Sequence, residues 1–177
     1  KNVLKLCTVV VYMFQVNKEE LSTEELKQYS HQMMIPELSE KEKNKLKIAK
    51  VLVIGAGNLG CSVLSYLTAA GVGTLGIVDA NNIETSHLHW QLLYHDADIG
   101  EPKVEVLYKK LQKLNPHVRV VACCENFSSS NAEVLLKNYD LVVDTTNNFL
   151  SRYAINDACV KYGKPFVQAS ISQFEGR

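Results

Sequence analysis

The chain has 177 residues, of which 46% are hydrophobic and 21% charged, and its 19 basic and 19 acidic side chains give a formal net charge of zero. This length suits one domain with a substantial core. The composition excludes a disordered or collagen-like protein, and the balanced charge argues against nucleic acid as a partner.

The first 21 residues are predicted to form a tail or an extra strand outside the main domain. The stretch VLKLCTVVVYMFQV is apolar, but it is shorter than the roughly 20 residues that span a bilayer, so no membrane contact is predicted. A signal sequence is the alternative, which is disfavoured because no initiator methionine precedes the stretch and no small-residue cleavage site follows it.

Two polar helices are predicted next in the chain. At Ser22 and at Ser39, a serine is followed three residues later by a glutamate. This is the spacing of a capping box, in which both side chains satisfy backbone N–H groups at the start of a helix. We therefore predict helices over residues 22–34 and 39–49. The second has few apolar positions, which is typical of a helix on the surface.

From Lys50 onward, short apolar runs alternate with helical patterns. Strands are predicted over residues 50–55, 74–79, 117–123, 139–146 and 165–171, and helices over 58–71, 102–115, 131–138 and 150–163. Because the strands are apolar at consecutive positions, they indicate a mostly parallel sheet with both faces covered. The predicted fold is a Rossmann-like, doubly wound α/β domain preceded by the two helices.

The cysteines contain no CxxC pair, and we interpret them as reduced, buried thiols of a cytoplasmic protein rather than a disulfide framework. Cys123 and Cys124 are adjacent, so on a strand they point to opposite faces and cannot hold one metal ion together. The full set is Cys7, Cys61, Cys123, Cys124 and Cys159.

The stretch VLVIGAGNLG places Gly55, Gly57 and Gly60 in GxGxxG spacing between a predicted strand and a predicted helix. The first glycine permits a tight turn, the second lets a phosphate approach the backbone, and the third lets helix and strand pack closely. Asp79 ends the next strand about 20 residues further on, where an acidic side chain binds ribose hydroxyls. This pattern suits NAD as well as ATP, and its alternative is a tight turn without a ligand.

Six stretches are informative together: YSHQMMIPEL, VLVIGAGNLGCSVLSYLTAAGVGTLGIVD, DIGEPKVE, LNPHV, YDLVVDTTNN and RYAINDACVKYGKPFVQASISQFEG. In this order and spacing they resemble the adenylation domain of the ThiF/MoeB and ubiquitin-activating enzyme family. The last stretch is especially similar to the eukaryotic molybdopterin-synthase adenylyltransferase and sulfurtransferase. The resemblance runs from about Thr23 to Arg177. It implies that residues 22–177 are a ThiF-type nucleotide-binding domain, and a fragment that lacks the family's C-terminal half.

The resemblance implies an enzyme that binds ATP and Mg2+ and joins AMP to the C-terminal carboxylate of a ubiquitin-like sulfur carrier ending in Gly-Gly. Such enzymes serve molybdopterin biosynthesis and tRNA thiolation, and they form homo- or heterodimers. By the same resemblance, Lys103 contacts ATP phosphates, Asp79 binds the ribose, and Asn81 stands where an aspartate is usual. The implied nucleotide contacts are Gly55, Gly57, Asn58, Gly60, Asp79, Asn81, His87, Gln91 and Lys103.

Several charged residues of the family's pattern are replaced. In the family's RYSRQ motif, the second arginine reaches the ATP of the partner subunit, and the two arginine positions here hold Gln28 and His31. In SNLxRQ, His87 replaces the asparagine and Trp90 replaces the arginine. In DxTDN, Asn147 replaces the aspartate that serves Mg2+ and ATP.

These replacements predict impaired catalysis. A hydrogen bond to a charged group contributes about 1.5–3 kcal/mol, so the loss of two arginines and a carboxylate predicts a rate lower by several orders of magnitude. The degenerate catalytic positions are His31, Trp90 and Asn147, and Lys103 is retained. The alternative is an inactive paralogue that acts as a dimer subunit or docking module, so the sequence leaves enzymatic activity open. An NAD-linked oxidoreductase is disfavoured, because no substrate domain is visible.

The replacing residues have further interpretations. A cationic or metal-binding cluster of His31, His87 and His89 is one hypothesis, but His87 and His89 share a face only on a strand, and no metal site is predicted. Trp90 is expected to pack over the vacated pocket, with stacking on adenine or cover of a partner surface as alternatives. Asp144 ends a predicted strand at the edge where ligands bind, and is a further candidate.

Overall fold

The computed structural model describes residues 20–172 and 175–176, so the predicted tail over residues 1–21, with Cys7, lies almost wholly outside them. Within the described residues, five strands form one parallel sheet in the order β3-β2-β1-β4-β5. They are β1 (Lys50–Ile54), β2 (Thr74–Val78), β3 (Arg119–Cys123), β4 (Leu141–Asp144) and β5 (Phe166–Gln168). The strand order reverses between β1 and β4, which confirms the predicted doubly wound α/β fold.

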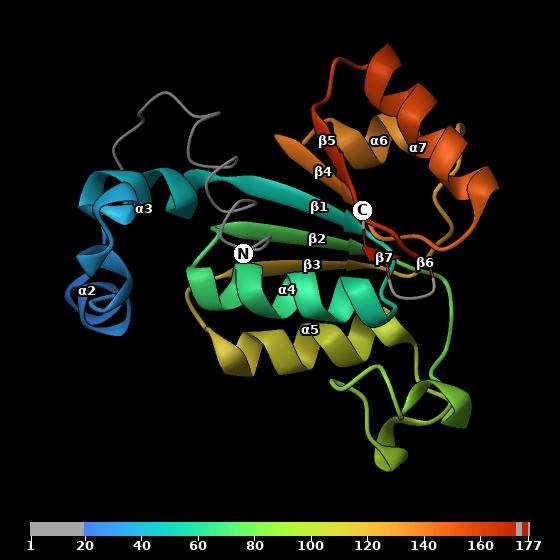
Figure 1. Cartoon of the computed structure of the whole chain (residues 1–177), viewed down its shortest axis with the longest axis horizontal. Helices are drawn as coiled ribbons and strands as arrows, with labels where there is room; N and C mark the ends of the chain where they lie inside the picture. The colour runs from blue at the N-terminus through green and yellow to red at the C-terminus, as the bar shows by residue number, and fades with distance from the viewer. Residues whose placement is uncertain (1–19, 173–174, 177) are drawn as a thin grey trace.

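Helices cover both faces of this sheet (Figure 1). They are α4 (Asn58–Ala70) and α5 (Lys103–Leu114) on one face, and α6 (Ala132–Leu136) and α7 (Phe149–Lys161) on the other. Val51 and Val53 of β1 pack into the core beneath α4 and α5. Leu52 and Ile54 pack into the core beneath α6 and α7. This double burial explains why the strand is apolar at the four consecutive positions from Val51 to Ile54.

The two N-terminal helices, α2 (Thr23–Gln28) and α3 (Glu40–Ile48), lie at the end of the sheet opposite the carboxyl ends of the strands (Figure 1). Two 3-10 turns join them, η1 (Gln32–Met34) and η2 (Pro36–Leu38). The prediction of one helix over residues 22–34 is therefore wrong beyond Gln28. The helix ends because Tyr29 turns inward, where its buried hydroxyl accepts a hydrogen bond from Asn115 Nδ2 at 2.8 Å.

The two predicted capping boxes have different outcomes. At Ser22 both bonds form: the Glu25 N–H donates to Ser22 Oγ at 3.2 Å, and the Ser22 N–H donates to Glu25 Oε2 at 2.8 Å. At Ser39 the prediction is wrong, because the hydroxyl donates to the Glu42 carboxylate and accepts nothing from the helix backbone. Helix α3 forms nevertheless.

A buried lysine joins α3 to the end of α4. The ammonium of Lys43, a residue only 1% exposed, donates to Gln32 Oε1 at 2.9 Å and to the carbonyl oxygen of Ala70, and it lies 3.7 Å from the centroid of the Tyr29 ring. Ala70 is the last residue of α4, where the helix carbonyls carry partial negative charge. The cation therefore satisfies a helix end that would otherwise need water.

Replacing Asn115 with alanine is expected to lower the free energy of unfolding by about 2–4 kcal/mol. Asn115 is fully buried, and its Nδ2 donates to the Tyr29 hydroxyl and to the Thr68 carbonyl oxygen, both at 2.8 Å. Without it, both acceptors stay buried and lose a donor. Urea denaturation measures the change. The exposed Asn138→Ala is the control, and an equal loss of stability in both variants would contradict the explanation.

The predicted strand over residues 165–171 is interrupted. Strand β5 ends at Gln168, and β6 (Ile171–Ser172) pairs instead with β7 (Glu175–Gly176) in an antiparallel ladder. The Ala169 N–H still donates to the Asp144 carbonyl oxygen at 2.9 Å. Strand β4 ends at Asp144, so the next residues have no neighbouring strand to follow.

The interpretation of the cysteines as buried thiols is correct for two of them. Cys61 and Cys159 are buried and Cys123 is half-buried, but Cys124 is exposed. Strand β3 ends at Cys123, which leaves Cys124 in the following loop. These four thiols, which are the cysteines within the described residues, form no disulfide. No helix in the described part of the chain is long and apolar enough to cross a membrane.

Candidate functional site

A cavity of about 900 Å3 lies at the carboxyl edge of the sheet, walled by the loops that follow β1, β2, β3 and β4 and by the start of α5. This edge is where open α/β sheets bind ligands. The predicted site residues that line it are Gly55, Gly57, Asn58, Asp79, Asn81, His87, Trp90, Gln91, Lys103 and Asn147. Gly60 and His31 are outside the lining.

The three glycines of the loop after β1 differ in what surrounds them. Gly55 has φ +104°, a backbone conformation that favours glycine, and a Cβ there would lie 2.8 Å from Thr145 Oγ1. A Cβ on Gly60 would lie 2.0 Å from the carbonyl oxygen of Gly55, so this glycine lets α4 pack against the turn. A Cβ on Gly57 would meet nothing within 4 Å. The backbone is thus open to the cavity at Gly57.

The start of α4 adds unpaired backbone donors beside Gly57. Gly57 is the N-cap of this 13-residue helix, and its side-chain position supplies no capping group. Asn58 and Leu59 at the first turn also line the cavity. The N–H groups of a first helical turn have no partner within the helix and carry partial positive charge. They suit an anion such as phosphate.

Asp79 connects the glycine loop to the loop after β2. Its carboxylate accepts hydrogen bonds from the Ala56 N–H at 2.8 Å and from the backbone and side-chain nitrogens of Asn81 at 2.8 and 2.9 Å. The carbonyl oxygen of Asn81 in turn accepts the Lys103 N–H at 3.0 Å. These bonds hold together three segments that are far apart in the sequence, at Ala56, at Asp79–Asn81 and at Lys103.

Lys103 places a cation in the cavity wall without an anion to balance it. The residue is only 5% exposed, and it opens helix α5. Within the described residues its ammonium forms no hydrogen bond and no ion pair, although it lines the cavity. The ammonium nitrogen keeps accessible surface, so it faces the open cavity. The site therefore favours an anionic ligand.

Arg152 is a cavity residue that the sequence analysis did not identify. It lies in the first turn of α7 and lines the cavity, and its Nε and Nη2 donate to the Thr146 carbonyl oxygen at 3.2 and 3.0 Å. It adds a second permanently charged side chain to the wall. The available signal was its position one turn after the carboxyl end of a predicted strand.

A model of the ThiF family matches residues 29–177. The chain belongs to the ThiF family. This result confirms the predicted resemblance to ThiF/MoeB-type adenylation domains.

Curated relatives of this ThiF-family chain are much longer than it is. It is 50% identical over 154 residues to the sulfur carrier protein adenylyltransferase of Thermus thermophilus, covering 87% of this chain and 57% of that protein. It is 46% identical over 157 residues to the probable adenylyltransferase/sulfurtransferase MoeZ of Mycobacterium tuberculosis, covering 89% of this chain and 40% of that protein. It is 44% identical over 157 residues to the adenylyltransferase and sulfurtransferase uba4 of Aspergillus niger, covering 89% of this chain and 33% of that protein.

Solved structures agree on the fold. The tRNA N6-threonylcarbamoyladenosine dehydratase TcdA of E. coli, in complex with ATP, superposes with a TM-score of 0.80 at 19% identity, covering 85% of this chain and 61% of that chain. At this level of identity the similarity supports the fold alone.

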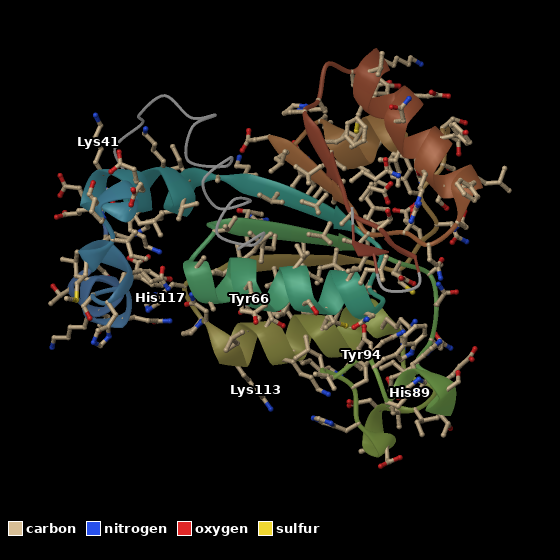
Figure 2. The ribbon with its side chains drawn as sticks, viewed as in Figure 1. Lys41, Tyr66, His89, Tyr94, Lys113 and His117 are labelled. Carbon is tan, nitrogen blue, oxygen red and sulfur yellow. The ribbon has the colours of Figure 1, made fainter. Side chains whose placement is uncertain are left out.

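The two replaced positions of the SNLxRQ motif lie in the cavity wall of the ThiF-family chain. His87 ends the 3-10 turn η3 (Thr85–His87), and its Nδ1 accepts the Glu84 N–H at 3.0 Å. Trp90 is 50% exposed and stacks on His89, with ring centroids 5.4 Å apart and planes 4° apart. Figure 2 shows His89 on the loop that projects beyond the sheet. Neither replacing side chain supplies the permanent charge of an arginine.

The cavity wall includes the carboxylates of Asp79, Glu84 and Glu125, but the position of the family's Mg2+-binding aspartate is neutral. Mg2+ prefers octahedral oxygen ligands, mostly carboxylates and phosphates. Both Asp79 oxygens already accept hydrogen bonds, and Asn147 offers a neutral amide where the family's pattern has a carboxylate. Across residues 20–172 and 175–176, no group of three or more His, Cys, Asp and Glu side chains is placed to hold a metal.

Asp144 lies beneath the cavity rather than in its wall. The carboxylate is 1% exposed, and its Oδ1 accepts hydrogen bonds from the Thr146 N–H at 2.9 Å and the Thr146 hydroxyl at 2.7 Å. These bonds shape the turn after β4 that carries Asn147. Asp144 therefore supports the wall from behind, in contrast to the direct role considered from the sequence.

Proposed function

We propose that this ThiF-family domain binds ATP and joins AMP to the C-terminal carboxylate of a ubiquitin-like sulfur carrier, at a rate well below that of a fully charged family site. Relatives named as sulfur carrier protein adenylyltransferase and adenylyltransferase/sulfurtransferase support the reaction and the carrier. An adenylyltransferase transfers an adenylyl group, so the same names support an adenine nucleotide as the donor. The chain spans about a third to just over half of those relatives, so the proposal covers the adenylation step alone.

The unpaired cation of Lys103 is the observation that carries this proposal. The Lys103 side chain and the open backbone at Gly57 line the same cavity, so both favour an anion, and a nucleotide phosphate supplies one. Asp79 Oδ2 accepts a single hydrogen bond, so it still has a lone pair for a ribose hydroxyl. We assign the phosphates to Gly57, Lys103 and Arg152, and the ribose to Asp79.

In the proposed reaction, a carboxylate oxygen of the carrier forms a bond to the α-phosphorus of ATP. The bond from that phosphorus to the oxygen bridging to the β-phosphate breaks, and pyrophosphate leaves with the electron pair. The protein contributes by orienting the two reactants and by balancing the phosphate charge. Two permanent cations of this chain, Lys103 and Arg152, serve the second task.

The replaced residues support the low rate. Trp90 and Asn147 line the cavity where the family's pattern has an arginine and an aspartate, and neither carries charge. His31 is exposed and outside the lining of its own cavity, as expected of a position that acts across a dimer interface. The same replacements support a second candidate function, an inactive paralogue that serves as a subunit or docking module of a dimer.

Exchange of labelled pyrophosphate into ATP, in the presence of a Gly-Gly carrier, separates the two functions. We expect slow exchange by the natural chain. The combined variant His31→Arg, His87→Asn, Trp90→Arg and Asn147→Asp is expected to exchange pyrophosphate at least about 100-fold faster. One hydrogen-bond donor that stabilises charge in the transition state raises a rate by about 10² or more.

A carrier shortened by its two C-terminal glycines is the control and should give no exchange. Rapid exchange by the natural chain would disprove the impaired rate. No exchange by either protein, with ATP binding intact, would favour the inactive paralogue, and failure of the combined variant alone to gain activity would contradict the residue assignments.

A further inference from the structure

A buried tyrosine connects the loop after β2 to the glycine loop. Tyr94 lies beside the N-terminal ends of α4 and α5 (Figure 2), and it is only 2% exposed. Its hydroxyl donates a hydrogen bond to the carbonyl oxygen of Ala56 at 2.8 Å. Burial raises the pKa of the Tyr94 phenol, so the hydroxyl keeps its proton and remains a donor. No motif of the sequence singled this residue out.

The peptide that Tyr94 holds is the one that joins Ala56 to Gly57. The described residues contain no cis peptide bond. In the trans peptide between them, the carbonyl of Ala56 and the N–H of Gly57 therefore lie in one plane and point in opposite directions. The preceding peptide is fixed as well, because the Ala56 N–H donates to Asp79 Oδ2 at 2.8 Å. Hydrogen bonds on both sides of Ala56 thus fix the orientation of this peptide.

The Gly57 N–H is the group that this orientation leaves free. In the described part of the chain it donates to no acceptor, and Gly57 lines the cavity with open space around it. A rotated peptide would instead turn the Ala56 carbonyl oxygen toward the cavity. A carbonyl oxygen repels a phosphate, whereas an N–H attracts it. The Tyr94 hydroxyl, together with a weaker hydrogen bond from Cys61 Sγ to the same oxygen at 3.6 Å, therefore decides which of the two groups a phosphate would meet.

We propose that Tyr94 is a positioning residue for the phosphate subsite, holding the Ala56–Gly57 peptide so that the Gly57 N–H faces the phosphate of a bound nucleotide. This inference rests on the nucleotide-binding part of the proposed function, and it does not depend on the carrier. It also connects the wall residues to the glycine loop, because the Tyr94 N–H donates to the Gln91 carbonyl oxygen at 3.0 Å.

Tyr94→Phe tests the proposal, because it removes the hydroxyl and keeps the ring that packs in the core. The matched control is Tyr139→Phe, a buried tyrosine whose hydroxyl makes no hydrogen bond within the described residues. Calorimetric titration with ATP and with adenosine measures both variants. Tyr94→Phe is expected to raise the Kd for ATP about three- to tenfold, the value of one hydrogen bond. The Kd for adenosine, which has no phosphate, should not change.

Two results would overturn the proposal: an ATP affinity of Tyr94→Phe equal to that of the natural chain, or an equal loss for ATP and adenosine, which would indicate a structural role only. Binding of ATP no tighter than adenosine by the natural chain would also overturn it, since no phosphate subsite would then exist. A natural chain that binds ATP but adenylates no carrier disproves the proposed function and leaves the role of Tyr94 intact.

Discussion

Replacing Lys103 with methionine is expected to weaken ATP binding by about 10- to 100-fold, which corresponds to the loss of a hydrogen bond to a charged group. The same variant should be at least as stable as the natural chain without ligand. The reason is that the Lys103 ammonium forms no hydrogen bond and no ion pair in the described structure, whereas methionine keeps the apolar part of the side chain. Thermal unfolding with and without ATP measures both effects.

Lys109→Met, on the exposed side of the same helix, is the matched control and should resemble the natural chain in both measurements. A bound ligand stabilises the folded protein by RT ln(1 + [L]/Kd), so at an ATP concentration below the Kd of the variant the ATP-dependent rise in Tm should nearly vanish only for Lys103→Met. A variant that is destabilised without ligand and still protected by ATP would show that Lys103 has a structural role instead.

Gly60→Ala is expected to lower the free energy of unfolding by about 3 kcal/mol or more, at the upper end of the cost of overpacking a core. Its Cβ would lie 2.0 Å from the Gly55 carbonyl oxygen, a contact that backbone must move to relieve. Gly57→Ala provides the contrast, since its Cβ enters open cavity. That variant should unfold like the natural chain, yet bind ATP more weakly because a methyl group occupies the approach to the N–H.

Urea denaturation and ATP titration of the two variants give a paired result. Loss of stability in Gly57→Ala would show that the open space around this glycine is needed by the fold. Full stability in Gly60→Ala would show that α4 can shift away from the turn after β1. Unchanged ATP affinity in Gly57→Ala would remove the phosphate from this part of the loop.

Local patterns were sufficient for the sheet and its covering helices, because consecutive apolar residues in β1 and the glycines after it leave few alternatives. They failed where a distant residue decides the local conformation. Helix α2 ends at Gln28 because Tyr29 reaches Asn115, which lies 86 positions further along the chain. Strand β5 ends where its neighbour β4 ends, a limit that its own residues do not contain.

In the candidate site, too, local patterns predicted some residues, and contacts between distant residues decided others. Spacing and resemblance pointed to the glycines, Asp79 and Lys103, and these residues meet around one cavity except for Gly60, which packs behind it. Arg152 and Tyr94 were not identified. Each lies outside the glycine motif, and its part in the site depends on contacts made through the backbone, with Thr146 in one case and Ala56 in the other. Such contacts produce no repeating pattern or motif by which a sequence would reveal them.

The hydrogen bonds that connect the N-terminal helices to the rest of the domain determine where this domain can be joined to another protein in a chimaera. A grafted unit that begins at β1 would omit Lys43 and Tyr29, baring the carbonyl end of α4 and leaving Asn115 without its hydroxyl partner. A cut at residue 29, where the family match begins, would still remove the Glu25 carboxylate that pairs with Lys47 at 2.7 Å. Chimaeras of this domain should therefore be joined before Leu21.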